Sequence, residues 1–233
     1  MALFKNIPHI SRKVYAHTFL NEIVLFFAYN PVKMGVVGND IMPFLSERGY
    51  YTITRKTGNV LICRDGNAIV TFMSSGVLVS IPSKEYHDFT TTGCVWEHLE
   101  EVLNRISVEP MVWTFSKSNR FIFNTPIRQN EQDAVFKLVL SKELIECSAD
   151  NHLYVSESED KTCVFSCQYV LGHMEDKDSL VVKNMLLSSS YSLSNLKEQV
   201  MSRNDDMFDC WHWCMSENVL QLMDSKQMQN ENR

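Results

Sequence analysis

The chain has 233 residues, of which 45% are hydrophobic and 21% are charged, so it can bury a core as one large domain or two small ones. Its formal net charge of −6 argues against extensive nucleic-acid binding, because such surfaces neutralise phosphates with Lys and Arg. The lack of an apolar run of transmembrane length, and seven cysteines without disulfide-framework spacing, predict a cytoplasmic protein with no membrane contact.

The first half of the chain predicts a strand, a short helix, an antiparallel meander and a second helix. Residues 18–29 are apolar on both faces, which is typical of a central strand. A short helix is expected from Asn39 to Arg48, with Pro43 in its first turn and Gly49 ending it. The expected meander strands are residues 50–54, 59–64, 68–73 and 77–81, and the second helix is residues 94–106.

The second half repeats this order of elements. A strand is predicted at residues 111–124, a helix from Asn130 to Ile145, and a long amphipathic helix at residues 192–224. Between the two helices we expect strands at residues 152–156, 162–171 and 180–187.

The repeated order predicts an α+β protein built from tandem duplicated strand-helix-antiparallel meander-helix units, the second ending in the long helix. The predicted division is an N-terminal unit of residues 1–109, a C-terminal unit of residues 110–224 and a disordered tail of residues 225–233. The prediction rests on the order of the elements, since the halves share little residue identity.

The long C-terminal helix is the best-defined feature of the sequence. Large apolar residues recur every seven positions between Met201 and Leu222 and predict one buried stripe. Asn195 followed by Glu198 predicts a capping box at the start. A rod of about 30 residues would be about 45 Å long, so the helix must either cross two lobes or break near residues 203–206.

Three segments carry a resemblance to a known family: EIVLFFAY at residues 22–29, EYHDFTTTGCVWEHLEEVL at residues 85–103 and MFDCWHWCMSENVLQLMD at residues 207–224. The chain resembles an uncharacterised, sporadically distributed family of prokaryotic proteins of about this length. The resemblance extends over nearly the whole chain and carries no catalytic residue. The patchy occurrence of the family implies a phage-defence, toxin–antitoxin or regulatory setting.

The cysteines predict core packing and not a metal site. On a helix Cys210 and Cys214 share a face, whereas His212 points about 200° away, so the three cannot bind one ion together. Cys163 and Cys167 are interpreted as core residues of a strand. We therefore expect no metal and no cofactor.

Two groups of acidic residues invite comparison with catalytic sites. One lies at residues 97–101 and includes His98, and the other comprises Asp205, Asp206 and Asp209. Charge runs on a helix usually form its solvated face. The motifs GxxxxGK[ST], GxGxxG, GxSxG and HExxH are also missing from the sequence. We expect no catalytic residue, although the second group leaves open a hydrolase or nuclease that uses a divalent ion.

Trp213 and its neighbour His212 are the predicted partner-binding residues. Trp213 lies on the side of the helix away from the apolar stripe, and tryptophan is enriched where interfaces derive most of their binding energy. The favoured hypothesis is a non-enzymatic cytoplasmic protein that binds a macromolecule, preferably a protein, in a defence, regulatory or toxin-neutralising module. A homo-oligomer stays open. The alternative is a small-molecule-binding protein with an apolar cup between sheet and helices.

Overall fold

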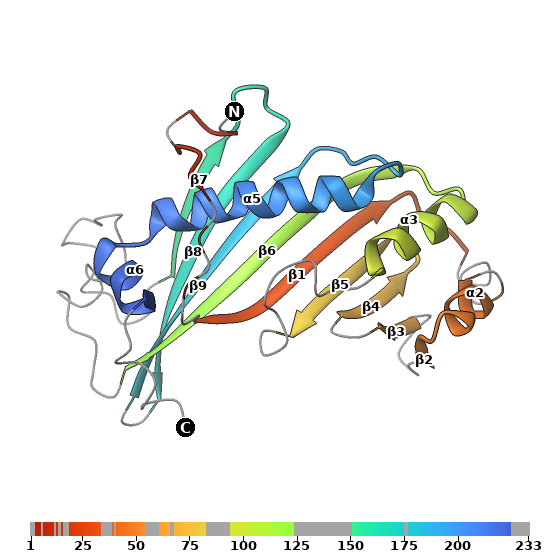
Figure 1. Ribbon diagram of the computed structural model, residues 1–233, viewed down its shortest axis with the longest axis horizontal. Helices are drawn as coiled ribbons and strands as arrows, with labels where there is room; N and C mark the ends of the chain where they lie inside the picture. Colours follow the sequence, from red (N-terminus) through yellow and green to blue (C-terminus); the bar gives the residue numbers. More distant parts are fainter. Residues whose placement is uncertain are drawn as a thin grey trace. The chain divides into compact units, whose positions relative to one another are not determined.

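The computed structural model describes residues 3–5, 7–11, 13, 15, 19–33, 39, 41–54, 61–65, 68–82, 94–123, 151–174 and 177–224. The predicted helix from Asn130 to Ile145 and the tail of residues 225–233 lie outside this part of the chain. Strands and helices both occur in it, which confirms the α+β class (Figure 1).

Each element predicted within the described residues has a counterpart, and the long C-terminal helix is present as two helices. The strands are β1 Leu20–Tyr29, β2 Tyr51–Thr54, β3 Leu61–Asp65, β4 Ala68–Met73, β5 Gly76–Pro82, β6 Pro110–Phe123, β7 Asn151–Glu157, β8 Cys163–Met174 and β9 Lys177–Ser188. The helices are α2 Met42–Glu47, α3 Val95–Arg105, α5 Leu196–Cys214 and α6 Glu217–Asp224.

The strands hydrogen-bond in the order β2-β3-β4-β5-β1-β6-β9-β8-β7. β1 has neighbours on both sides, which confirms the central strand predicted from its two apolar faces. β1 pairs antiparallel with β5, so that Phe26 lies opposite Leu78, and β2 to β5 form the predicted antiparallel meander. β7 and β8 are also antiparallel.

The chain forms two compact units, each assembled from segments that are distant in sequence. Unit 1 comprises residues 1–21, 118–185 and 205–233, and unit 2 comprises residues 22–117 and 186–204. These units differ from the predicted division between residues 109 and 110. The difference arises because β6, β9 and α5 each contribute residues to both units.

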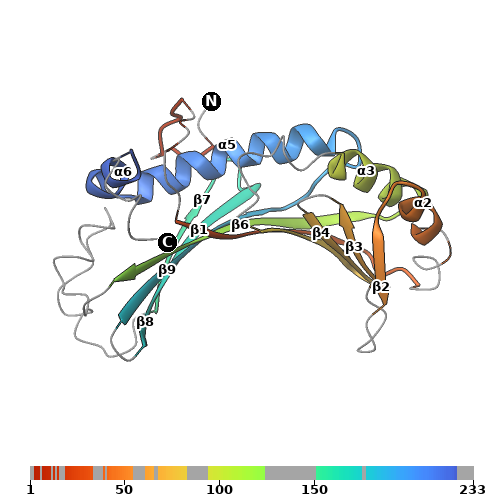
Figure 2. The same cartoon turned by 60° about the horizontal axis from the view of Figure 1, so that its bottom comes forward.

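The core of unit 2 forms on one face of its strands, where α2 and α3 lie (Figure 2). Along β1, Ile23, Leu25 and Phe27 are fully buried. The Phe27 ring stacks on that of Trp113 with centroids 5.1 Å apart and meets Tyr191 edge-on at 5.3 Å. Burial raises the pKa of Tyr191 to about 12. β1, β6 and the segment before α5 are thus joined through one aromatic cluster.

The opposite face of β1 carries Val24, Phe26 and Ala28, which are half-buried. The Phe26 ring lies over Gly76 of β5, where an added Cβ would come within 2.5 Å of two ring carbons and 2.9 Å of the Phe27 carbonyl oxygen. Glycine is therefore required at this position, because it lets the ring and the neighbouring backbone approach closely.

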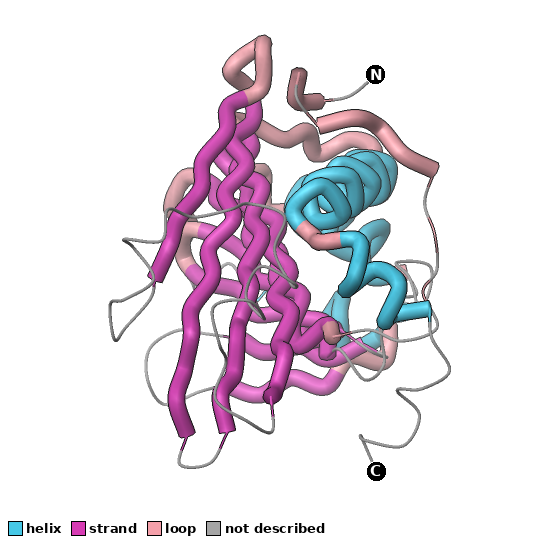
Figure 3. The backbone as a smooth tube through the Cα atoms, turned by 90° about the vertical axis from the view of Figure 1, so that its left-hand side faces the viewer, coloured by secondary structure: helices cyan, strands magenta, loops and turns pink. Residues whose placement is uncertain are grey.

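In unit 1, α6 and the C-terminal part of α5 lie on one side of β7, β8 and β9 (Figures 1 and 3). Cys163 and Cys167 of β8 and Cys210 and Cys214 of α5 are buried and are free cysteines. A hydrogen bond with Cys167 and burial raise the pKa of the Cys214 thiol, and burial raises that of Cys210. The thiols stay neutral and pack as small apolar groups, as predicted.

The long helix breaks later than predicted. It stops at Cys214 and resumes at Glu217, so the prediction of a break near residues 203–206 is wrong. The N–H of Leu220 donates to the Ser216 carbonyl oxygen at 3.1 Å and begins the new helix. A serine immediately before a helix is a preferred N-cap residue, so the Ser216-Glu217 sequence carries the signal for this restart.

The start of α5 also differs from the predicted capping box. Asn195 has a φ of 62°, and the Leu196 N–H donates to a carboxylate oxygen of Glu100 at 2.8 Å. The Gln199 amide donates to the carbonyl oxygens of Ser192, Ser194 and Asn195 and accepts from the Ser192 N–H. A neighbouring helix and a glutamine thus do what the sequence assigned to Asn195 and Glu198.

Gly76→Ala should destabilise the protein, because its methyl group would displace the Phe26 ring and press on the β1 backbone. Overpacking of this kind costs about 1–3 kcal/mol, a fall of roughly 2–10 °C in melting temperature for a chain of this size. Calorimetry of Gly76→Ala beside Ser75→Ala, an exposed neighbour expected to be silent, measures it. In the double variant Phe26→Ala/Gly76→Ala the loss should be smaller than the sum of the single losses; simple additivity would contradict the clash.

Asp160 should control the β7–β8 turn as the pH falls. Its carboxylate accepts from the Ser158 hydroxyl, the Thr162 N–H and the Thr162 hydroxyl at 2.7, 3.0 and 2.8 Å. These bonds lower its pKa from 3.8 to about 2. Because the folded-state pKa is depressed, the turn is stabilised above the ordinary pKa and loses this stabilisation as the pH falls towards 2. Carboxyl ¹³C NMR titration should show an upward pKa shift of Asp160 in Ser158→Ala and none in Glu159→Gln.

Candidate functional site

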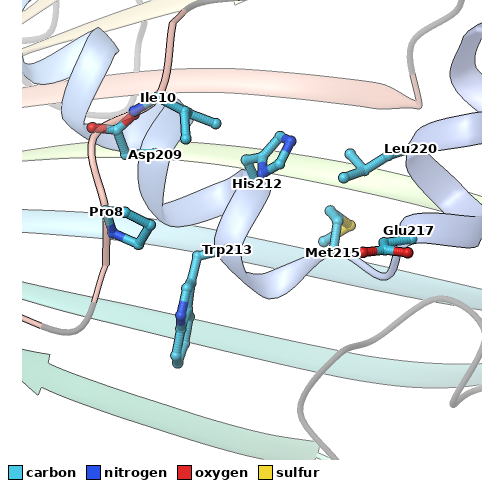
Figure 4. A pocket seen from close by; sticks show the side chains of 8 residues that line it. All are labelled: Pro8, Ile10, Asp209, His212, Trp213, Met215, Glu217 and Leu220. Carbon is cyan, nitrogen blue, oxygen red and sulfur yellow. The ribbon is translucent and has the colours of Figure 1, made fainter.

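The end of α5, the start of α6 and the N-terminal segment together form a pocket of about 190 Å³ in unit 1 (Figure 4). Both predicted partner-binding residues line it. The lining residues are Pro8 and Ile10 from the N-terminal segment, Asp209, His212 and Trp213 from α5, Met215 from the helix break, and Glu217 and Leu220 from α6. Five of these eight residues have apolar side chains, so the pocket offers an apolar interior with polar groups beside it.

Asp209 fixes the N-terminal segment against α5. Its carboxylate accepts a hydrogen bond from the Ile10 N–H at 3.1 Å and lies 2.8 Å from Nδ1 of His9. The Asp209 side chain is only 8% exposed, whereas that of His9 is 61% exposed. The prediction that Asp209 belongs to the solvated face is therefore wrong, because the segment near the N-terminus covers it. This anchorage places Pro8 and Ile10 at the pocket.

Two further contacts hold the same segment along the helices. Lys13 forms an ion pair with Asp224 at the end of α6, and this hydrogen bond raises the Lys13 pKa. The Tyr15 ring meets Trp211 edge-on with centroids 5.7 Å apart, and partial burial raises the Tyr15 pKa. The N-terminal segment is thus bound to both α5 and α6 by charged and aromatic contacts.

The helix turn at residues 211–213 divides its aromatic residues between core and pocket. Trp211 is buried and packs against Phe208 with centroids 5.8 Å apart. His212 and Trp213 are half-buried and line the pocket. Glu217 is exposed beside them, in the first turn of α6.

The other candidate acidic residues serve as structural contacts in unit 2. Glu97 forms an ion pair with Lys197 at 2.6 Å, and Glu101 forms ion pairs with Arg48 and Arg105. Partial burial opposes ionisation of Glu97, but the hydrogen bond from Lys197 outweighs it and lowers the Glu97 pKa. Within the described residues, no group of three or more His, Cys, Asp or Glu side chains is arranged to hold a metal ion.

Sequence reasoning missed the contribution of the N-terminal segment to the pocket. His9 and Asp209 are 200 positions apart, and no local pattern links them. Pro8 and Ile10 likewise belong to no periodic segment. A detectable signal existed only for the concave junction itself, in the serine that starts α6.

No protein-family model matches the chain, and no match to a curated protein was found. Among the helices in the described part of the chain, none combines the length and apolar character needed to cross a bilayer.

Asp209→Ala should loosen the N-terminal segment, because it removes the acceptor of the Ile10 N–H and the partner of His9. Hydrogen bonds to charged groups contribute about 1.5–3 kcal/mol, so exchange of the Ile10 amide hydrogen should accelerate by roughly 10- to 100-fold. Hydrogen exchange followed by NMR measures this. Glu198→Ala, at an exposed position of the same helix, is the matched control. Wild-type protection of Ile10 in Asp209→Ala would contradict the anchoring role.

Proposed function

We propose that this chain is a non-enzymatic protein that binds a macromolecular partner, and that the partner is a protein. The observation that carries the proposal is the clustering of His212 and Trp213 with apolar side chains from three segments in one small pocket. Tryptophan in a partly exposed apolar pocket is the side chain most often associated with interface hot spots.

The size of the pocket favours a side chain over a whole small molecule. Sites that enclose drug-sized ligands usually have volumes of about 300–1,000 Å³, whereas this pocket measures about 190 Å³. An engineered cavity of about 150 Å³ holds one benzene molecule, which is close to the size of an aromatic side chain. The pocket therefore fits one anchoring residue better than it fits the ligand of an apolar cup.

The contacts of the acidic residues weigh against the enzymatic hypothesis. Asp209 accepts hydrogen bonds from the N-terminal segment, and Glu97, Glu100 and Glu101 each bind a neighbouring helix or its cap. Carboxylates engaged in this way are committed to structure.

Three further parts of the proposal concern setting and origin. Free buried thiols favour a reducing compartment, and we place the protein in the cytoplasm. The resemblance to sporadically distributed prokaryotic proteins suggests a defence, regulatory or toxin-neutralising module. A tandem duplication accounts for the strand order, since the last meander strand lies beside the opening strand in each half, β5 beside β1 and β9 beside β6.

Trp213→Ala should weaken partner capture while leaving stability almost unchanged. A hot-spot residue contributes about 2 kcal/mol or more to binding, so capture should fall by at least about 30-fold. The partner is isolated with the tagged wild-type chain from its own host and identified by native mass spectrometry. Binding of the purified partner to each variant is then titrated.

Trp211→Ala is the structural counterpart, because it removes a buried ring from the same helix turn and should cost about 3–5 kcal/mol of stability. A loss of several degrees in melting temperature for Trp213→Ala would place that residue in the core instead. Unchanged binding of the purified partner by Trp213→Ala would reject the pocket as the binding site.

A further inference from the structure

The charges beside the pocket point to the chemistry of its occupant. Among the described lining residues, those with a formal charge at neutral pH are both acidic, Asp209 and Glu217. The Asp209 carboxylate is buried and already accepts from Ile10 and contacts His9. Glu217 is exposed and lies in the first turn of α6. The rim therefore presents one negative charge to solvent, at a fixed place beside an apolar hole.

The pocket walls are held in place before any partner arrives. Ile10 and Pro8 are fixed through Asp209, whereas Trp213 and Leu220 stand on two helices whose junction is closed by the Met215 N–H, which donates to the carbonyl oxygens of Trp211 and His212 at 3.2 and 3.3 Å. Rigid walls reduce the entropy lost on binding. A single inserted side chain can therefore contribute more than its area alone suggests.

On the basis of the proposed function, we infer that the pocket receives one large apolar side chain of a partner peptide that has a Lys or Arg next to this side chain, placed to pair with Glu217. The apolar anchor fits the volume and lining of the hole. The cation matches the exposed carboxylate at the rim and the net charge of −6 of the whole chain, which attracts basic partners over longer distances. Charge complementarity thus selects a basic, apolar segment over an acidic one.

The test uses the full chain and a phage-displayed library of random 12-residue peptides. Peptides are selected on the immobilised wild-type chain and depleted on Trp213→Ala, so that only pocket-dependent sequences remain. The best peptide is then synthesised with its basic flanking residues as Lys, Gln or Glu. Its affinity for the wild-type chain, Glu217→Gln and Glu217→Lys is measured by fluorescence anisotropy. Gln221→Glu, an exposed change on α6 outside the pocket lining, controls for general charge effects.

We expect selected peptides to share an apolar anchor beside Lys or Arg. An exposed ion pair contributes about 0.2–1 kcal/mol, so Glu217→Gln should weaken the Lys peptide about 2- to 5-fold. Glu217→Lys should make the Glu peptide bind more tightly than the Lys peptide. Pocket-dependent peptides with neutral or acidic flanks, or indifferent to Glu217→Gln, would overturn this inference and leave the proposed function standing.

Two outcomes would overturn the inference by naming a different occupant or none. Selection that yields no Trp213-dependent peptide would reject the pocket as a peptide site and would count against the proposed function too. Sedimentation velocity showing a wild-type dimer that Trp213→Ala dissociates would identify a second copy of this chain as the occupant.

Discussion

The buried carboxylate of Asp209 is the constraint on which the N-terminal part of unit 1 depends. A charge taken out of water is costly unless hydrogen bonds replace its hydration. Here the replacements come from the Ile10 N–H and the His9 ring, 199 and 200 positions away in sequence. Helix α5 can therefore bury Asp209 only when the N-terminal segment lies against it. The cost of isolating this charge couples the segment to the helix more strictly than apolar packing alone would.

The second constraint is the interruption of the helix at Met215 and Ser216. A single straight helix presents a convex surface, whereas two helices meeting at an interruption form a concave junction, and concavity is what binding sites require. The apolar residues Met215 and Leu220 come from the two sides of this junction. The pocket thus results from two independent causes, a buried charge that holds one wall and a helix restart that positions the other.

Periodicity predicted most of the secondary structure correctly. The two apolar faces of residues 18–29 identified a central strand, and Pro43 and Gly49 marked the ends of a short helix because their backbone restrictions act locally. Features that depend on distant partners escaped prediction. Glu100 caps α5, Asp209 binds His9, and Asn204 is buried because its side-chain oxygen accepts from Lys117 at 2.7 Å. A polar residue gives no sign in the sequence of whether a partner will cover it.

The candidate site was predictable only as far as helical geometry reaches. Residues two positions apart on a helix point about 200° apart, so Trp211 and Trp213 cannot share an environment. If one enters the core, the other must face away from it. The burial of Trp211 beside Tyr15 and the position of Trp213 at the pocket follow this rule. What the rule leaves undetermined is what Trp213 meets on its own side. There the answer lies with Pro8 and Ile10, whose positions depend on the distant Asp209 and not on the helix pattern itself.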